Sequence, residues 1–335
     1  MDAAALPWPI LFGLIGVALA FDFLNGMNDA ANSIATIVST RVLRPQYAVA
    51  WAAFFNFIAF LVFGLSVAET IGRGIVDVTV IDSHVIFAAL AGAIIWQIIT
   101  QRLGIPSSSS HALIGGLVGG GIAKGGTSVV IWSGLGKTTA AIFLSPGLGC
   151  VLALFLMLFV SWAFVRYTPY SVDNLFRRVQ FISASAYALG HGGNDAQKTM
   201  GIIAVLLYSQ GDLGQKFYVP LWVVLACQAA MAAGTLGGGW RIVRTMGSRI
   251  TRLTPMQGVC AETAGSVMLF AATHLGIPVS TTHTITGSII GVGAAKKVSA
   301  VRWSVAKEIM TAWILTIPAA GVLAAFFYWF AGLFS

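Results

Sequence analysis

The sequence predicts an all-α integral membrane protein, with ten to twelve membrane segments in two inverted repeats that contain broken or re-entrant helices. The first observation behind this prediction is composition: of 335 residues, 57% are hydrophobic and 9% charged, and the mean hydropathy is +0.86. Soluble domains carry about 25% charged residues. Only helices or closed barrels span lipid. The apolar stretches have helix length and lack the alternating pattern of barrel strands, so we expect helices.

The second observation is an internal repeat. The segments "LGIPSSSSHALIGGLVGGGIAKG" (103–125) and "LGIPVSTTHTITGSIIGVGAAKK" (275–297) align without a gap, and 11 of their 23 positions are identical. Shared hydrophobicity alone does not place so many identities at matched positions. We therefore divide the chain into a first repeat (1–165), a polar linker (166–179) and a second repeat (180–335).

The charges of matching loops predict that the two repeats face opposite ways in the membrane. The loop 240–252 carries four arginines and no acidic residue. Its counterpart in the first repeat, 71–82, has Arg73 against Asp77 and Asp82. Because basic loops remain in the cytoplasm, the loop 240–252 is expected inside and its counterpart outside.

A second pair of loops differs in the opposite sense. The segment 41–44 is basic, whereas its counterpart around Asp212 and Lys216 is neutral. Matching loops thus alternate in charge, as an inverted repeat requires, and the basic linker 166–179 is placed in the cytoplasm. The net charge of +8 has the same origin, so no nucleic-acid partner is expected.

Each repeat contains five apolar stretches, an odd number that is consistent with inversion. In the first repeat they are 8–39, 47–68, 84–102, 106–123 and 138–165. A span needs about 20 residues, so the first and last stretches are long enough to be broken into two pieces. This length gives the range of ten to twelve segments.

An Asn-Asp motif occurs once in each repeat. The copies read "GMNDAAN" (26–32) and "GGNDAQK" (192–198) and are 166 positions apart. In a helix, residues three or four apart share one face. That face of the first copy groups Asp22, Asn25, Asn28, Asp29 and Asn32. A carboxylate at membrane depth marks a functional site by default, although the amides could instead only join helices through hydrogen bonds.

Carboxylate and amide oxygens are hard ligands, which suit sodium or a proton better than a soft metal. Glycines beside both motifs also suggest that each helix breaks there. These glycines are Gly26, Gly190, Gly192 and Gly193.

Two hydroxyl clusters, "PSSSSH" (106–111) and "PVSTTH" (278–283), each predict the start of a helix. Proline lacks the N–H that would go unsatisfied there, and hydroxyls cap the free amides. A helix start inside a protein-lined cavity directs N–H groups and the positive end of the helix dipole at an anion. Plain N-capping is the alternative. His111 and His283 could bind the anion or satisfy backbone carbonyls.

Other polar residues in the apolar stretches have open roles. Lys198, three residues after Asp195, could pair with that carboxylate or with an anionic substrate, or extend to the interface. Asn56 and Gln228 match under a shift of 172 and interrupt apolar stretches. Together with the repeat, this pattern is typical of secondary transporters, whose sites lie where inverted repeats meet.

These residues resemble the inorganic phosphate transporter (PiT) family, in a compact prokaryotic form. The family signature is a duplicated Gly-x-Asn-Asp-x-x-Asn-type motif with paired hydroxyl motifs, and the likeness covers nearly the whole chain. The second copy departs at Lys198, where the first has Asn32. Eukaryotic-type members carry acids at the positions of Asn56 and Gln228, so the roles of those acids do not transfer.

The resemblance implies a multi-pass protein of the cell (inner) membrane that imports inorganic phosphate by symport with a cation, for which we favour sodium. Proton coupling, a metal–phosphate substrate and another oxyanion such as sulfate are alternatives. An alternative of another class is a lipid-phosphate phosphatase with Ser110–His111 or Thr282–His283 as nucleophile and base. Adjacent helical residues point about 100° apart, so we expect no enzyme.

The expected site has two parts. Phosphate is expected to contact Asn28, Asp29, Asn32, Ser108, Ser109, Ser110, Asn194, Lys198, Ser280, Thr281 and Thr282. Sodium is expected at Asp22, Asn25, Asn28, Asp29, Asn194 and Asp195. The partners are therefore phosphate, sodium (or protons) and the lipid bilayer; sodium is a co-transported ligand and no other cofactor is expected. Glycine-rich faces are compatible with a homo-oligomer, and Glu262 is left as a buried hydrogen-bonding residue without an assigned role.

Overall fold

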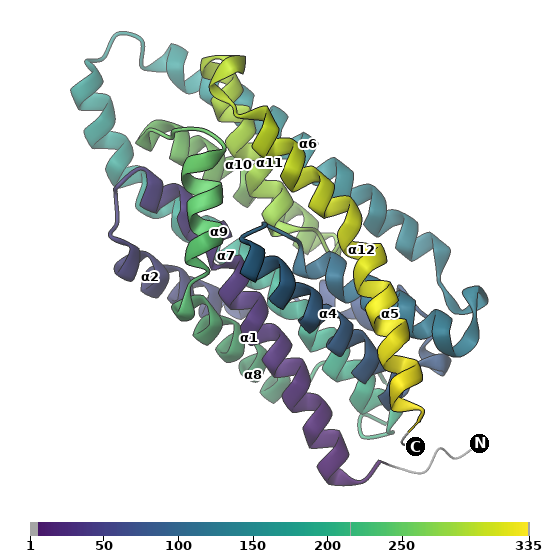
Figure 1. The fold of residues 1–335 in the computed structure, drawn as a ribbon. Coiled ribbons are helices and arrows are strands. Elements are labelled where there is room, and N and C mark those ends of the chain that lie inside the picture. The colour runs from purple at the N-terminus through teal and green to yellow at the C-terminus, as the bar shows by residue number, and fades with distance from the viewer. Residues whose placement is uncertain (1–5, 215, 334–335) are drawn as a thin grey trace.

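The computed structural model describes residues 6–214 and 216–333, and within them the chain forms twelve α-helices joined by short turns. The first half contains α1 (Trp8–Ser39), α2 (Pro45–Ile58), α3 (Ser66–Arg73), α4 (Ser83–Leu103), α5 (Ser109–Gly125) and α6 (Trp132–Ala163). The second half contains α7 (Pro169–Ser209), α8 (Leu221–Gly237), α9 (Trp240–Arg244), α10 (Pro255–His274), α11 (Thr281–Lys296) and α12 (Trp303–Ala331). The predicted all-α class is confirmed (Figure 1).

Four helices, α1, α4, α6 and α12, are long and apolar enough to cross a membrane, and the bent pairs α2–α3 and α8–α9 raise this number to six. The outward faces of α6 and α12 are strongly apolar, with Phe143, Phe155 and Phe326 exposed. Lipid covers such a surface without the penalty that water would impose.

The helix breaks lie at other positions than the glycines suggested. α1 is one 32-residue helix that passes through Gly26, and α7 passes unbroken through Gly192 and Gly193. α6, the last apolar stretch of the first repeat, is also one 32-residue helix. The chain bends instead by 83° between α2 and α3 and by 63° between α8 and α9. The expected breaks at the motifs were therefore wrong.

The glycines of the motifs serve close packing. A Cβ added at Gly26 would lie 2.1 Å from the carbonyl oxygen of Met231 in α8, and one at Gly192 would lie 2.5 Å from that of Asn56 in α2. The helices gain close contact there, which offsets the cost of about 1 kcal/mol of a glycine in a helix. In an apolar environment an intact helix also keeps its backbone groups paired.

The two halves interlock rather than forming separate domains. α5 packs along α12, and its counterpart α11 packs along α6, so each pair joins one helix from either half. The close approaches are repeated as well: a Cβ on Gly115 would lie 2.4 Å from the oxygen of Ile317, and one on Gly287 would lie 2.1 Å from that of Pro146. Neither half can therefore bury its helices fully without the other.

The interior consists of two hydrophobic clusters, and both α1 and α7 run from one cluster into the other. α1 contributes residues from 11–21 to the first cluster and from 31–37 to the second. α7 contributes residues from 184–188 to the second cluster and from 196–207 to the first. The Asn-Asp motifs lie at these crossovers, between the two apolar cores.

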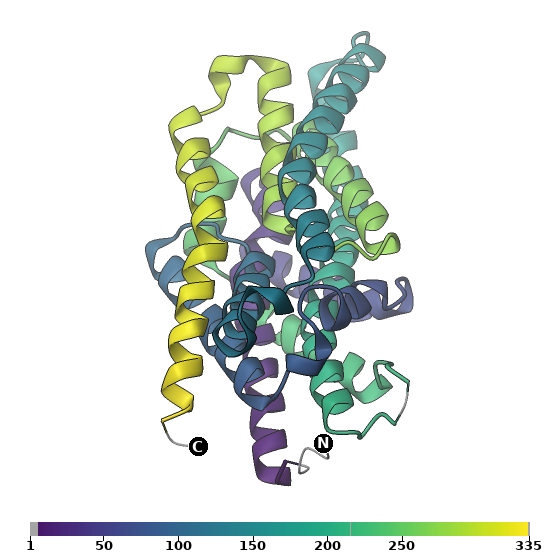
Figure 2. The ribbon, with the colours of Figure 1, turned by 90° about the vertical axis from the view of Figure 1, so that its right-hand side faces the viewer.

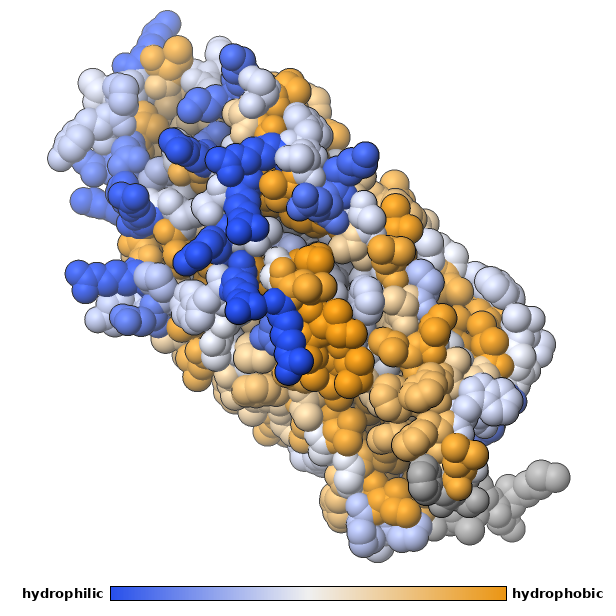
Figure 3. Space-filling view, in the orientation of Figure 1, coloured by the Kyte–Doolittle hydropathy of each residue, from blue (hydrophilic) through white to orange (hydrophobic). Residues whose placement is uncertain are grey.

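One end of the molecule gathers the basic segments. There Arg177 Nη1 donates a hydrogen bond to the backbone oxygen of Arg41 at 3.2 Å, and Arg241 Nη1 donates to that of Arg102 at 2.7 Å. Figure 3 shows hydrophilic side chains collected at this end of the face it presents, and mainly hydrophobic ones over the remainder.

The opposite end carries a few balanced charges. Lys124 Nζ lies 2.6 Å from Asp82 Oδ2. The guanidinium of Arg73 lies over the rings of Tyr208 and Phe217, 5.7 and 4.9 Å from their centroids. The start of α1 and the end of α12 both lie at this end (Figures 1 and 2).

The packing of α1 against α8 gives a first prediction. Gly26→Ala places a methyl group against backbone that cannot turn aside, so we expect a loss of about 1–3 kcal/mol of stability, as for other overpacked interiors. Gly16→Ala in the same helix is the control, because nothing lies within 4 Å of its added Cβ, and alanine favours the helix. The thermal unfolding midpoint of the purified protein measures both. Equal midpoints in the two variants would contradict the packing role of Gly26.

Candidate functional site

Two helix starts meet at the centre of the molecule. α5 begins after Ser108 and α11 begins after Ser280, and each of these serines accepts a hydrogen bond from the backbone N–H of the histidine three residues on, at 3.3 Å. The helix starts predicted from the hydroxyl clusters are thus confirmed. Ser110 Oγ donates to the oxygen of Val279 at 3.1 Å, which joins the start of α5 directly to the turn before α11.

The first Asn-Asp motif faces both helix starts. The Asp29 carboxylate accepts hydrogen bonds from Ser109 Oγ at 2.8 Å and from Thr282 Oγ1 at 3.1 Å. One turn further along α1, Asn32 Nδ2 donates to Thr281 Oγ1 at 3.1 Å and to Thr282 Oγ1 at 2.9 Å. α1 therefore presents one carboxylate and one amide to hydroxyls of both halves.

The second motif brings an ion pair to the same place. Lys198 Nζ donates to Asp195 Oδ1, to Ser110 Oγ and, at 2.9 Å, to the oxygen of Val279. Asp195 Oδ2 accepts from Thr281 Oγ1 at 2.8 Å. Lys198 is 1% exposed and Asp195 is fully buried. The alternative that Lys198 extends to the membrane interface is excluded, and its predicted pairing with Asp195 is confirmed.

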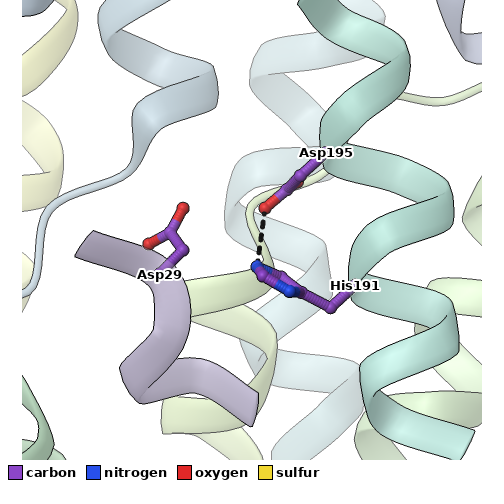
Figure 4. Close-up of side chains that lie close together, drawn as sticks. All are labelled: Asp29, His191 and Asp195. Carbon is purple, nitrogen blue, oxygen red and sulfur yellow. Dashed lines mark ion pairs between the residues drawn. The ribbon is translucent and has the colours of Figure 1, made fainter. Parts of the chain in front are cut away.

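A histidine completes the contacts of this carboxylate. His191 Nε2 lies 3.2 Å from Asp195 Oδ2, and His191 Nδ1 lies 3.1 Å from both Ser33 Oγ and Asn56 Oδ1. Figure 4 shows the His191 ring and the Asp195 side chain from one helix with Asp29 opposite them. One ligand atom from each of Asp29, His191 and Asp195 fits within 4.8 Å of the others, so these three could share a metal ion.

A separate group of oxygens surrounds Asp22. Asn25 and Thr199 lie next to its carboxylate. Neither oxygen of Asp22 accepts a well-formed hydrogen bond, and Asn25 Oδ1 and Thr199 Oγ1 are also without a partner. All three residues are at most 1% exposed. Buried oxygens left unpaired are costly, and a bound cation would satisfy several at once.

Two further residues predicted for the site, Asn28 and Asn194, each have an unpaired amide oxygen. Both side chains are buried. The amide nitrogen of Asn194 is held by Thr273 Oγ1 at 3.0 Å and the oxygen of Ile277 at 3.4 Å. The two asparagines therefore each keep one oxygen available for a ligand.

Other polar residues lie apart from the site or support it. Glu262 accepts hydrogen bonds from Gln180 Nε2 at 2.9 Å and from Ser183, in a buried cluster of its own. His111 and His283 pack edge to face with ring centroids 4.4 Å apart. The backbones of Trp313 and Ile142, respectively, face these two rings. The ring nitrogens of both histidines nevertheless make no well-formed hydrogen bond to any described residue.

Sequence reasoning missed several contributors. Ser33 and Thr199 occupy equivalent positions in the two motifs, so extending the motif alignment by one residue would have found them. Tyr187, whose hydroxyl donates to the oxygen of Thr281 at 2.9 Å, carried no signal. Asn56 interrupts an apolar stretch, but the sequence does not indicate its contact with His191.

The fold and the site define a membrane transport protein: helix starts, buried carboxylates and a buried ammonium meet at one point between apolar cores. The chain belongs to the phosphate transporter family, because the sequence model of that family matches residues 25–324. This family consists of transporters, so the chain is not an enzyme.

Individual relatives are described as phosphate transporters as well. A protein of Rhizobium meliloti (strain 1021), described as "Probable low-affinity inorganic phosphate transporter", is 70% identical over 99% of both chains. A protein of Bacillus subtilis (strain 168) with the same description is 43% identical over 93% of this chain and 94% of its own. A solved structure described as "The sodium-dependent phosphate transporter" has the same fold, with a TM-score of 0.88 over 98% of this chain and 100% of its own, at 24% identity.

The hydrogen bonds of Thr281 yield a second prediction. Thr281→Val keeps the shape but leaves Asp195 and Asn32 each short of a partner, so we expect a loss of about 1–3 kcal/mol, the usual cost of stranding buried polar groups. Thr286→Val in the same helix is the matched control, because its buried hydroxyl has no partner. Thermal unfolding of both variants tests this. A control that loses as much stability as Thr281→Val would show that the hydrogen bonds of Thr281 are unimportant.

Proposed function

We propose that this protein imports inorganic phosphate by symport with a cation, and that the cation is sodium. One observation supports this most directly: two helix starts that favour an anion converge on buried carboxylates that require a cation. Family membership and the descriptions of the relatives support the phosphate part. The solved structure with this fold is described as sodium-dependent, which supports the choice of cation.

Phosphate would bind at the meeting of the helix starts. The hydroxyls of Ser109, Thr281 and Thr282 now donate to Asp29 and Asp195, and each can rotate to donate to an anion instead. The positive ends of α5 and α11 add N–H groups and favourable dipoles. The full proposed set is Asn28, Asp29, Asn32, Ser108, Ser109, Ser110, Asn194, Lys198, Ser280, Thr281 and Thr282.

The charges of the site provide a physical reason for coupling. If ionised, Asp22, Asp29 and Asp195 outweigh Lys198 by two negative charges, and all four are buried. Phosphate entering this region alone would meet net repulsion, which is strong where water is scarce. A cation that binds first removes that repulsion, so phosphate binding and cation binding favour one another.

Sodium would take oxygens that lack a partner. The proposed ligands are Asp22, Asn25, Asn28, Asp29, Asn194 and Asp195. Among them, Asp22 has both carboxylate oxygens unpaired, and Asn25, Asn28 and Asn194 each have an unpaired amide oxygen. Such uncharged and carboxylate oxygens are hard ligands suited to an alkali cation.

We further propose that the chain spans the membrane ten to twelve times as two inverted repeats, 1–165 and 180–335. The exchange of helix partners between the halves and the gathering of arginines at one end support this arrangement. The basic end, with the linker 166–179, would be cytoplasmic. Alternating access would then open the central site to one end at a time.

Transport of a metal–phosphate complex is a second candidate function. It is favoured by Asp29, His191 and Asp195, because one ligand atom from each lies within 4.8 Å of the others. Two carboxylates and an imidazole are ligands that bind divalent ions such as Mn²⁺. In that case the divalent ion would be part of the substrate and would travel with phosphate.

The sodium proposal predicts a selective effect of Asp22→Asn. Because Asp22 lies beside Asn25 and Thr199 and not against the hydroxyl clusters, its neutralisation should raise the sodium concentration for half-maximal uptake about tenfold or more. Uptake at saturating sodium should change much less. Radioactive phosphate uptake into proteoliposomes measures this, with Asp212→Asn, an exposed loop acid, as the control.

In the same assay, gradients of sodium and of protons are imposed separately at several pH values, and sulfate is tested as a competitor. Uptake driven by a proton gradient alone, and insensitive to sodium, would replace sodium by protons as the coupling ion. Absence of phosphate uptake under either gradient would falsify the proposed function.

Removal of divalent metals separates the two candidate substrates. If free phosphate is carried, uptake in the presence of excess EDTA should remain within about twofold of the untreated value, since sodium is not chelated. If a metal–phosphate complex is carried, EDTA should abolish uptake, and added Mg²⁺ or Mn²⁺ should restore it. We expect the first result.

A further inference from the structure

We propose that Lys198 is a tethered cation: its ammonium group permanently fills the second of two cation positions that the inverted repeat creates, so that the protein co-transports one free cation fewer than its symmetry provides for. This inference rests on the proposed function and concerns its stoichiometry.

The repeat supplies the starting point. Under the shift of 166, Asp29 corresponds to Asp195, and Asn32 corresponds to Lys198. Each carboxylate thus has a side chain one turn further along its own helix, neutral in the first half and charged in the second. The two halves present equivalent carboxylates to the centre but treat their charge differently.

The surroundings of the Lys198 ammonium resemble those of a bound alkali cation. Its three contacts are a carboxylate oxygen of Asp195, the hydroxyl of Ser110 and the backbone oxygen of Val279. An ammonium group has three N–H donors, so all three are used. Carboxylate, hydroxyl and carbonyl oxygens are also the hard ligands that a sodium ion takes.

This arrangement also limits what else Lys198 can do. The Lys198 side chain is 1% exposed and is held by residues of two helices. Because all three N–H donors of its ammonium group are engaged, it can donate to phosphate only after one of these contacts breaks. Its main contribution is therefore the charge it places beside Asp195. Phosphate is attracted by that charge, as by any cation at this position.

The first half lacks such a charge. Asp29 has no lysine or arginine within ion-pair distance among the described residues. Asn32 donates to two threonine hydroxyls, but an amide cannot neutralise a carboxylate. Asp22 and Asn25, on the same helix as Asp29, have unpaired oxygens as well, and the unpaired hydroxyl of Thr199 in α7 lies beside Asp22. Free cations therefore neutralise Asp22 and Asp29, whereas Lys198 neutralises Asp195, whose Oδ2 can still serve as a ligand.

The test is Lys198→Asn, which restores the residue of the first repeat and opens the position to a free ion. Simultaneous uptake of ²²Na and ³²P into proteoliposomes gives the ratio of sodium to phosphate. We expect the ratio to be about one unit higher in the variant than in the unmodified protein, and the sodium dependence to become correspondingly steeper. Lys216→Asn, on an exposed turn, should leave both unchanged.

A second measurement needs no transport. A ligand that binds only the folded state stabilises it by an amount that increases with the logarithm of the ligand concentration above its Kd. In purified protein without phosphate, the unfolding midpoint of Lys198→Asn should therefore rise more steeply with sodium, against N-methylglucamine as the substitute, than that of the unmodified protein. If the variant folds only at high sodium, this result also supports the proposal.

An unchanged ion ratio, an unchanged sodium dependence of the midpoint, or a variant that sodium cannot restore to the folded state would each overturn the tethered-cation role. The proposed function stands or falls separately, because it is tested by phosphate uptake in the unmodified protein. The midpoint measurement remains decisive even if protons drive that uptake.

Discussion

The structure depends on two buried carboxylates, Asp29 and Asp195, being held where the helix starts of α5 and α11 meet. Hydroxyls that are at most 4% exposed donate hydrogen bonds to both carboxylates, and the Lys198 ammonium also donates to Asp195. A carboxylate in this environment is expensive unless it is paired or solvated by fixed dipoles. The starts of α5 and α11 supply hydroxyl groups that pair both carboxylates. The apolar clusters on either side separate this site from water.

The close helix packing follows from the same constraint. Hydroxyls reach the carboxylates only if four helices approach the centre together, and small residues permit this approach. Gly26 and Gly192 bring the motif helices against α8 and α2, while Gly115 and Gly287 bring the hydroxyl helices against α12 and α6. Motif glycines and motif acids thus perform one task, since the first allow the distances that the second need.

Much of this could be predicted from sequence because the information was local or repeated. The helix starts at Ser108 and Ser280 followed from proline and capping hydroxyls, and the pairing of Lys198 with Asp195 followed from helical spacing. The helix breaks could not be located, because a glycine in a well-packed helix and a glycine at a bend look alike. The contacts of His191 with Ser33 and Asn56 join residues 158 and 135 positions apart, a distance that no local pattern encodes.

The interlocking of the two halves has a consequence for biogenesis. Asp29 receives a hydrogen bond from Thr282, which is made 253 residues later, and α5 packs on α12, the last helix of the chain. During synthesis the first half therefore precedes Thr282, and Asp29 has only its Ser109 partner until the second half is made. The contacts of α1 and α5 are thus completed only when the second half is present, so we expect membrane insertion of the first half to precede its final packing.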